Sequence, residues 1–236
     1  MSKPTYAQEP SFLRNIARLS RFFLDGKINP EGLGKERIST VTPEQAAEIM
    51  GQNFYSLEDV KQLFDSRFTE EELEDLAVVP YSMEILEENS WDHVLIPCTP
   101  VSLMEMEYLF TRSKFRACHW YVSQEFANTP AEVGWKLVDT TPVLDSMGKS
   151  WEQQLDLLSK EEDVPSAVVL AQVILLHYQR TGQKLFDYGY VRTADVDNDH
   201  RRVLLGSGSG LSRLVIGGDW GSSEEYTGLA SHIKPG

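Results

Sequence analysis

The chain has 236 residues, of which 41% are hydrophobic and 25% are charged, as in an ordinary globular protein. Its formal net charge of −14 argues against nucleic acid as the main partner, because phosphate contacts need clustered Lys and Arg. The longest apolar run, residues 167–176, is too short to cross a bilayer, so we expect no membrane partner. The N-terminus lacks the apolar stretch of a signal peptide, and we expect a cytoplasmic protein whose two cysteines, Cys98 and Cys118, are reduced.

Residues 1–85 predict a small helical N-terminal region. An amphipathic pattern over residues 12–24 indicates its first helix. Further helices are expected to begin at Thr42, Ser56 and Thr69, because each can cap free backbone amides and is followed by acidic residues that suit the positive helix end. The helix after Thr69 is expected to stop before Pro80, and we place a boundary between residues 80 and 90.

Residues 86–236 predict a mixed α+β domain. The apolar run His93-Val94-Leu95-Ile96 indicates a buried strand that Pro97 ends, and residues 115–122 and 134–138 indicate two further strands. Together with the helices that follow, these strands predict two or three helices packed on a twisted antiparallel sheet.

Three helices are expected in this second region. Ser102 caps one that runs to about Phe110, and residues 148–158 form an amphipathic pattern. The third covers residues 167–180 and ends at Gly182, which supplies a left-handed cap. Its apolar residues lie on almost every face, so we expect it to be buried on several sides.

The tail, residues 185–231, differs from the chain before it. Half of the sixteen glycines lie between Gly206 and Gly236, and residues 185–223 contain no Glu, Lys, Gln or Met. Apolar runs at 202–205 and 211–216 alternate with Gly/Ser clusters, which predicts short strands joined by tight turns. Such a frame presents small, hydroxylic and charged side chains, and it suits binding better than packing.

Several short motifs occur in a set order: Ile49-Met50-Gly51-Gln52-Asn53-Phe54, Gly134-Trp135-Lys136-Leu137-Val138, the stretch from Ser150 to Leu158, Glu162-Asp163-Val164-Pro165-Ser166-Ala167, Thr181-Gly182-Gln183-Lys184-Leu185-Phe186, Tyr190-Val191-Arg192-Thr193, and Gly228-Leu229-Ala230-Ser231. From about residue 43 onward, this order resembles the variable proteins of diversity-generating retroelements, many of them from uncultured bacteria. The resemblance implies a C-type lectin-like domain over residues 86–236, with a variable C-terminal region at about 203–231 that forms a solvent-facing ligand site.

The resemblance also implies how the tail acquires its composition. In this family, mutagenic reverse transcription at template adenines rewrites asparagine codons, which cannot yield Glu, Lys, Gln, Met or Trp. Trp220, Glu224 and Glu225 would then be fixed positions, with Trp220 a structural anchor. The chain departs from the family at Asp199-His200 and over 232–236, which leaves the variable positions open. A simpler interpretation is that Gly/Ser-rich hairpins are always poor in Glu and Lys.

We therefore predict a ligand-binding protein rather than an enzyme, with no cofactor. Its partner would be an unidentified protein or other macromolecule that contacts the C-terminal surface. Tyr and Arg would provide affinity, and Ser and Gly adaptable contacts. The candidate ligand-binding residues are Ser207, Ser209, Ser212, Arg213, Asp219, Trp220, Ser222, Ser223 and Tyr226.

Two tail motifs allow other sites. Gly206-Ser207-Gly208-Ser209-Gly210 suggests a phosphate loop, but such a loop must open a helix, and a plain turn fits the following apolar run better. The residues from Asp195 to Asp199 have the alternating carboxylates of a calcium loop, yet His200 and Gly206 stand where an EF-hand needs Gly and Glu. Calcium bound in another arrangement stays open beside a turn closed by Asp and Asn side chains.

A zinc site from His93, Cys98, Cys118 and His119 is a further possibility, although paired Cys-x-x-Cys spacing is missing and the thiols suit buried positions. His177 is expected to be a hydrogen-bonded core residue. Two other functions stay open: an enzyme related to the formylglycine-generating branch of the lectin-like fold, and an assembly protein that oligomerises through the helices between residues 12 and 76.

Overall fold

The computed structural model describes residues 41–114, 119–186, 189–207, 214–219 and 225–236. The chain divides into residues 1–39 and a second, compact unit, residues 40–236, which is described below. The candidate helix at 12–24 lies outside the described residues. The boundary expected between residues 80 and 90 falls inside the second unit, because apolar side chains from both sides of it share one core, among them Met50, Val79 and Leu95.

Helices α2 (Pro43–Met50), α3 (Leu57–Phe64), α4 (Glu70–Asp75) and α5 (Met83–Asn89) follow one another along the chain, with the 3-10 turn η1 (Gly51–Asn53) after α2. The predicted starts of the first three are confirmed. Thr42, Ser56 and Thr69 each accept a hydrogen bond from the backbone N–H three residues on, and the side chain there accepts one in return. These reciprocal caps satisfy amides that the helix itself leaves unpaired.

The first sheet contains β1 (His93–Cys98), β2 (Gly134–Asp139), β8 (His232–Ile233) and β3 (Glu162–Asp163), in the order β1-β2-β8-β3 with antiparallel pairing throughout. The prediction that Pro97 ends the first strand is wrong, since β1 continues to Cys98. β1 is an edge strand, and the Leu95 carbonyl faces outward to the Tyr55 amide. The backbone nitrogen of Pro97, two residues further, points to the same outer side. Pairing with β2 therefore requires no N–H at this position.

The second sheet contains β4 (Tyr190–Val196), β5 (Arg202–Ser207), β6 (Leu214–Gly218) and β7 (Thr227–Leu229), in the order β6-β5-β4-β7. β4 and β5 are antiparallel, as are β5 and β6, whereas β4 and β7 are parallel. The predicted short tail strands are confirmed as β5 and β6, with residues 211–213 outside the described part. The fold is thus α+β with two four-stranded sheets, where one had been expected.

The remaining helices are α6 (Leu103–Lys114), α7 (Glu125–Asn128), α8 (Trp151–Leu155) and α9 (Ala167–Thr181), with the 3-10 turn η2 (His119–Tyr121). α6 extends beyond the predicted end at Phe110, and α8 is shorter than the predicted 148–158. The strand predicted at 115–122 is wrong where the structure describes it, because residues 119–121 form η2. There the aromatic Trp120 donates a hydrogen bond from Nε1 to the Ile216 carbonyl at 3.1 Å and thus covers the edge of β6.

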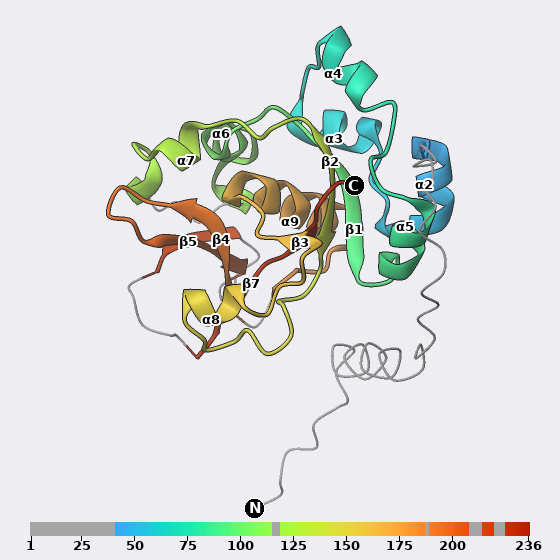
Figure 1. Cartoon of the computed structure of the whole chain (residues 1–236). Helices are drawn as coiled ribbons and strands as arrows, with labels where there is room; N and C mark the ends of the chain where they lie inside the picture. The colour runs from blue at the N-terminus through green and yellow to red at the C-terminus, as the bar shows by residue number, and fades with distance from the viewer. Residues whose placement is uncertain (1–40, 115–118, 187–188, 208–213, 220–224) are drawn as a thin grey trace, which may run out of the picture. The chain divides into compact units, whose positions relative to one another are not determined.

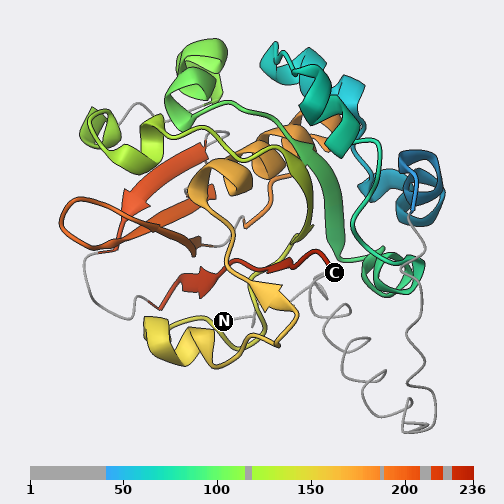
Figure 2. The ribbon, with the colours of Figure 1, turned by 45° about the horizontal axis from the view of Figure 1, so that its top comes forward.

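Helix α9 lies between the two sheets, as Figures 1 and 2 show from two directions. Every residue from Ala167 to Leu176 is buried, which confirms the expected burial on several sides. The helix ends at Gly182, whose φ of 69° is in the left-handed region and whose N–H donates to the Tyr178 carbonyl, as predicted. Within the described residues, no helix combines the length and apolarity needed to cross a membrane.

Candidate ligand-binding surface

The structure describes three of the nine candidate ligand-binding residues. Ser207 is the last residue of β5, Asp219 directly follows β6, and Tyr226 directly precedes β7. The other six lie outside the described residues: Ser209, Ser212, Arg213, Trp220, Ser222 and Ser223.

Strand pairing places Ser207 and Tyr226 at the same end of the second sheet. Ser207 pairs with Leu214, while Tyr190 pairs with both Gly206 and Thr227. The end of β5 and the starts of β4, β6 and β7 therefore lie together. Gly206 and Ser207 of the phosphate-loop motif belong to strand β5, which pairs antiparallel with β6, whereas residues 208–210 lie outside the described residues.

Tyr226 combines a fixed backbone with an exposed side chain. Its carbonyl accepts a hydrogen bond from the Tyr190 N–H at 3.0 Å, and 63% of the residue is exposed to solvent. A large amphipathic side chain held in this way suits ligand contact, as the candidate assignment predicts.

Asp219 lies at the opposite end of the sheet, where its N–H donates to the Arg202 carbonyl at 2.8 Å. Its Oδ2 accepts a hydrogen bond from Nε of Arg192 at 2.6 Å, and 11% of the Asp219 side chain and 3% of the Arg192 side chain are exposed. The candidate ligand contact is therefore half of a largely buried ion pair. Its carboxylate stabilises the second sheet and already accepts a hydrogen bond from Arg192.

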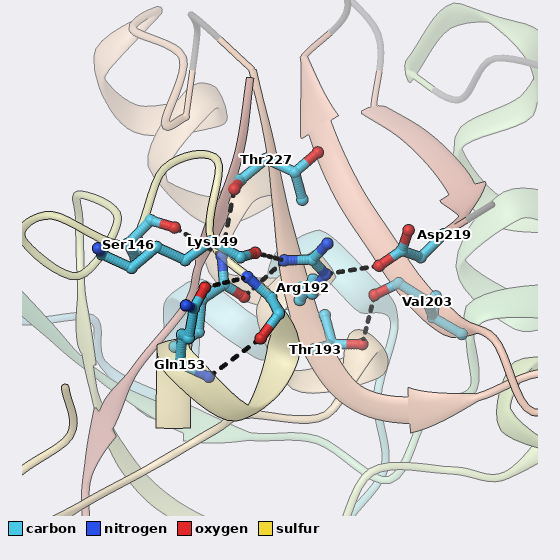
Figure 3. Close-up of polar contacts among 10 residues, drawn as sticks. Ser146, Lys149, Gln153, Arg192, Thr193, Val203, Asp219 and Thr227 are labelled. Atoms are coloured by element: carbon cyan, nitrogen blue, oxygen red, sulfur yellow. Dashed lines mark hydrogen bonds and ion pairs between the residues drawn. The ribbon is translucent and has the colours of Figure 1, made fainter. Parts of the chain in front are cut away.

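Arg192 is the centre of a polar network that sequence reasoning missed (Figure 3). One terminal guanidinium nitrogen donates to the Lys149 carbonyl at 2.9 Å and to Oε1 of Gln154 at 2.8 Å. Gln154 is fully buried, and its Nε2 donates to the carbonyls of Ser146 and Thr227, at 2.7 and 3.2 Å. Buried charge is costly unless it is paired and hydrogen-bonded, and here Nε and one terminal nitrogen of Arg192 both donate to acceptors.

The alternation of β4 explains why this network lies where it does. Val191 faces the core around α9, so its neighbour Arg192 faces the other side of the sheet, where α8 lies. From there Arg192 connects β4 with Asp219 after β6, and through Gln154 it reaches β7. One guanidinium thus connects three of the four strands of the second sheet.

The loop before α8 also covers the free edge of β7. The Val143 N–H donates to the Leu229 carbonyl at 2.9 Å, and the Leu229 N–H donates to Oγ of Ser146 at 3.0 Å. The Gly148 N–H donates to the Thr227 carbonyl at 3.2 Å. Trp120 covers part of the β6 edge, so the backbone of the second sheet is held at both of its edges.

In the acidic stretch from Asp195 to Asp199, Asp195 and Val196 end strand β4, and the turn that follows is closed by the Asp197 side chain, in line with the simpler interpretation. Oδ1 of Asp197 accepts the backbone N–H groups of Asp199 and Arg201, both at 2.9 Å, and Oδ2 accepts Nε of Arg201 at 2.8 Å. Desolvation by itself raises the pKa of Asp197. Together these hydrogen bonds lower the pKa by a larger amount, so the net shift is downward. Within the described residues, no group of three His, Cys, Asp or Glu side chains is placed to hold a metal.

The residues considered for zinc are only partly described, since Cys118 and the His119 side chain lie outside. His93 is buried, and its Nδ1 lies 2.6 Å from Oδ1 of Asp92. His177 is hydrogen-bonded as predicted, with Nδ1 3.2 Å from the Tyr55 hydroxyl, although it is half-buried. Cys98 is a free thiol in the core, and burial raises its pKa to about 12.

This pKa predicts an inert thiol. Burial disfavours the thiolate, which is the reactive form of a cysteine, and it also keeps a reagent away from Cys98. In a Cys118→Ser variant, a disulfide reagent that reports thiols by absorbance should leave the folded protein unmodified and react fully in denaturant. Rapid modification of the folded protein would contradict the burial of Cys98.

The described tail therefore has a backbone fixed by buried polar contacts, with Asp219 directed into the framework and Tyr226 toward solvent. Searches of known protein families, curated proteins and solved structures found no match to this chain.

Proposed function

We propose that the chain is a ligand-binding protein with a C-type lectin-like fold, which presents residues of about 203–231 as a surface diversified by a retroelement. The observation that carries the proposal is the buried network around Arg192, which fixes the strands of the tail. It is combined with the absence of Glu, Lys, Gln and Met from residues 185–223. The composition fits rewriting of asparagine codons. The network supplies a backbone on which side chains can be exchanged.

A fixed backbone that carries exchangeable side chains is favourable for binding. A surface that keeps its backbone fixed does not lose the free energy of ordering a loop each time a ligand binds. Exchange of exposed side chains then changes the ligand without endangering the fold, since other side chains of the same strands make the core contacts. α9 and the strands around it supply that core, with Val191, Val203 and Leu205 buried on the face opposite Arg192.

The assembly alternative receives less support from the packing. The apolar sides of α2 and α3, two helices of this alternative, face the interior. Ala46 and Met50 lie in one core cluster with Leu95, and Val60 and Phe64 lie in another with Ile96. These helices therefore use their apolar surface within the chain. The enzymatic alternative required a reactive thiol, and the raised pKa of Cys98 does not favour one at that position.

Substitution within the tail gives the biochemical test. Changing Ser209, Ser212 and Ser222 together to Asn, Tyr or Asp should alter the unfolding free energy by no more than about 0.5 kcal/mol per site, the usual range for surface positions. Urea denaturation followed by tryptophan fluorescence measures this quantity. Losses of several kcal/mol would show that these side chains belong to the core, and the proposal would fail.

The genetic test is independent of folding. Copies of this gene in related genomes should differ mainly at codons for residues 203–231, at adenines of a nearby template repeat beside a reverse transcriptase gene. Differences spread evenly along the chain would contradict diversification.

A further inference from the structure

Two large, exposed side chains belong to neighbouring segments where β4 and β7 begin. Tyr226 is 63% exposed and Met147, on the loop before α8, is 40% exposed. Both lie against Gly189: a Cβ atom there would be 2.2 Å from the Tyr226 carbonyl oxygen and 3.4 Å from Cε of Met147. The Sδ atom of Met147 also lies 2.8 Å from the Cβ position of Gly228. The Tyr226 backbone and the Met147 side chain therefore adjoin at Gly189, and the exposed surface of these two residues is called the Tyr226 patch below.

Two carboxylates accompany the Tyr226 patch. Glu225 is exposed, and its Cα lies 3.8 Å from the Cβ position of Gly148, next to Met147. Asp145 is exposed two residues before Met147. The salt bridges between described residues include neither carboxylate. Lys149 is the one cation in residues 145–149 and 225–226, so these segments are acidic overall.

We propose that the Tyr226 patch, with Glu225 and Asp145, binds a lysine or arginine side chain of a partner protein. The inference rests on the proposed binding function and names the chemistry of its ligand. An aromatic ring attracts a cation over its face, and the thioether of Met147 offers apolar contact to the methylene stem of the same side chain. The carboxylates provide charge-assisted hydrogen bonds.

The charge of the whole protein points the same way. A net charge of −14 attracts basic partners at long range, whereas it repels acidic partners and a second copy of the chain. Asp145 and Met147 also lie outside residues 203–231, and the codon argument makes Glu225 a fixed position. The carboxylates and Met147 would therefore be constant, whereas Tyr226 lies within the region proposed to vary.

Binding of a labelled peptide to the full chain tests the proposal. The probe is a fluorescein-labelled peptide of nine arginines, with the citrulline peptide as its neutral isostere, and affinity is measured by fluorescence anisotropy. Tyr226→Ala should weaken binding about three- to fivefold, as expected for loss of one exposed cation–ring contact, while Tyr226→Phe should retain the affinity. Glu225→Gln should also weaken binding, and Lys149→Ala should strengthen it.

Matched controls separate this site from general attraction to an acidic protein. Tyr108, 85% exposed on α6, and Glu70, exposed on α4, are changed to Ala and Gln and should each leave the affinity within about 1.5-fold. Equal effects of Tyr226→Ala and Tyr108→Ala, or no effect of either, would show that net charge alone binds the peptide and would overturn the proposal. Equal affinity for the citrulline peptide would show that the patch recognises no cation.

The two proposals fail in different ways. If Tyr226→Ala has no effect but substitutions over residues 208–213 change the affinity for a ligand, only the cation site is wrong. If Tyr226→Ala weakens peptide binding while related genes show no concentrated variation in the tail, the cation site stands and the diversified surface fails.

Discussion

Replacing Arg192 by alanine is expected to lower the unfolding free energy by roughly 3–5 kcal/mol, the usual loss when one partner of a buried ion pair is removed. The variant leaves the Asp219 carboxylate largely buried without its 2.6 Å partner, and it also removes the donor from the Lys149 carbonyl and from Gln154. Urea denaturation at pH 7 measures the loss. Because total stability is only about 5–15 kcal/mol for most domains, the variant should be close to unfolding at 37 °C.

Three companion variants make this expectation specific. Arg67 is exposed, and its change to alanine should alter the free energy by no more than about 0.5 kcal/mol. Arg192→Lys should be intermediate, because one ammonium cannot reproduce the planar donor arrangement that meets Asp219 and Gln154. In a double-mutant cycle, Asp219→Asn should cost less in the Arg192→Ala background than alone. A loss below about 1 kcal/mol for Arg192→Ala would show that the network does not hold the tail strands.

Local features of the fold followed from the sequence. The caps at Thr42, Ser56 and Thr69 involve residues only three positions apart, so a short motif contains both partners of each hydrogen bond. The burial of α9 and its end at Gly182 could also be predicted, because an almost wholly apolar run followed by glycine is typical of a buried helix with a left-handed cap.

Other features depend on contacts that no short motif contains. Arg192 is separated by 27 residues from Asp219 and by 38 from Gln154, so neither partner could be assigned from local pattern. The one available signal was an arginine among Tyr190, Val191 and Thr193, residue types that favour strands. Trp120 shows the same limit, since its aromatic neighbourhood favours a strand by propensity, whereas the structure uses its indole to cover the β6 edge.

The candidate ligand residues show where reasoning from composition stops. Asp219 follows two glycines, and that context indicated an exposed turn, yet the side chain points into the framework. Tyr226, a candidate from the same tail, faces solvent. The difference arises from position in the sheet: β6 ends beside Arg202 and near Arg192, whereas Tyr226 lies at the other end of the sheet, before β7. Strand order therefore decides which polar tail residues are available to a ligand.

Gly206→Ala is expected to reduce the unfolding free energy by about 3 kcal/mol, because the tail strands approach one another too closely for a side chain at this position. An added Cβ would lie 2.3 Å from the Gly189 carbonyl oxygen and 3.2 Å from Cα of Tyr190. Both are backbone atoms, so relief requires β4 and β5 to move apart. That movement would displace Tyr190, whose N–H holds the Tyr226 carbonyl.

Gly217→Ala is the matched control. Gly217 belongs to the same sheet and pairs with Leu204, but a Cβ there would meet only the Leu204 Cβ at an ordinary 3.8 Å. This variant should change stability by no more than about 0.5 kcal/mol. Hydrogen exchange should show faster opening of the Tyr190 amide in Gly206→Ala and no change in Gly217→Ala. If both variants are equally stable, the close approach of β4 and β5 does not fix the surface that carries Tyr226.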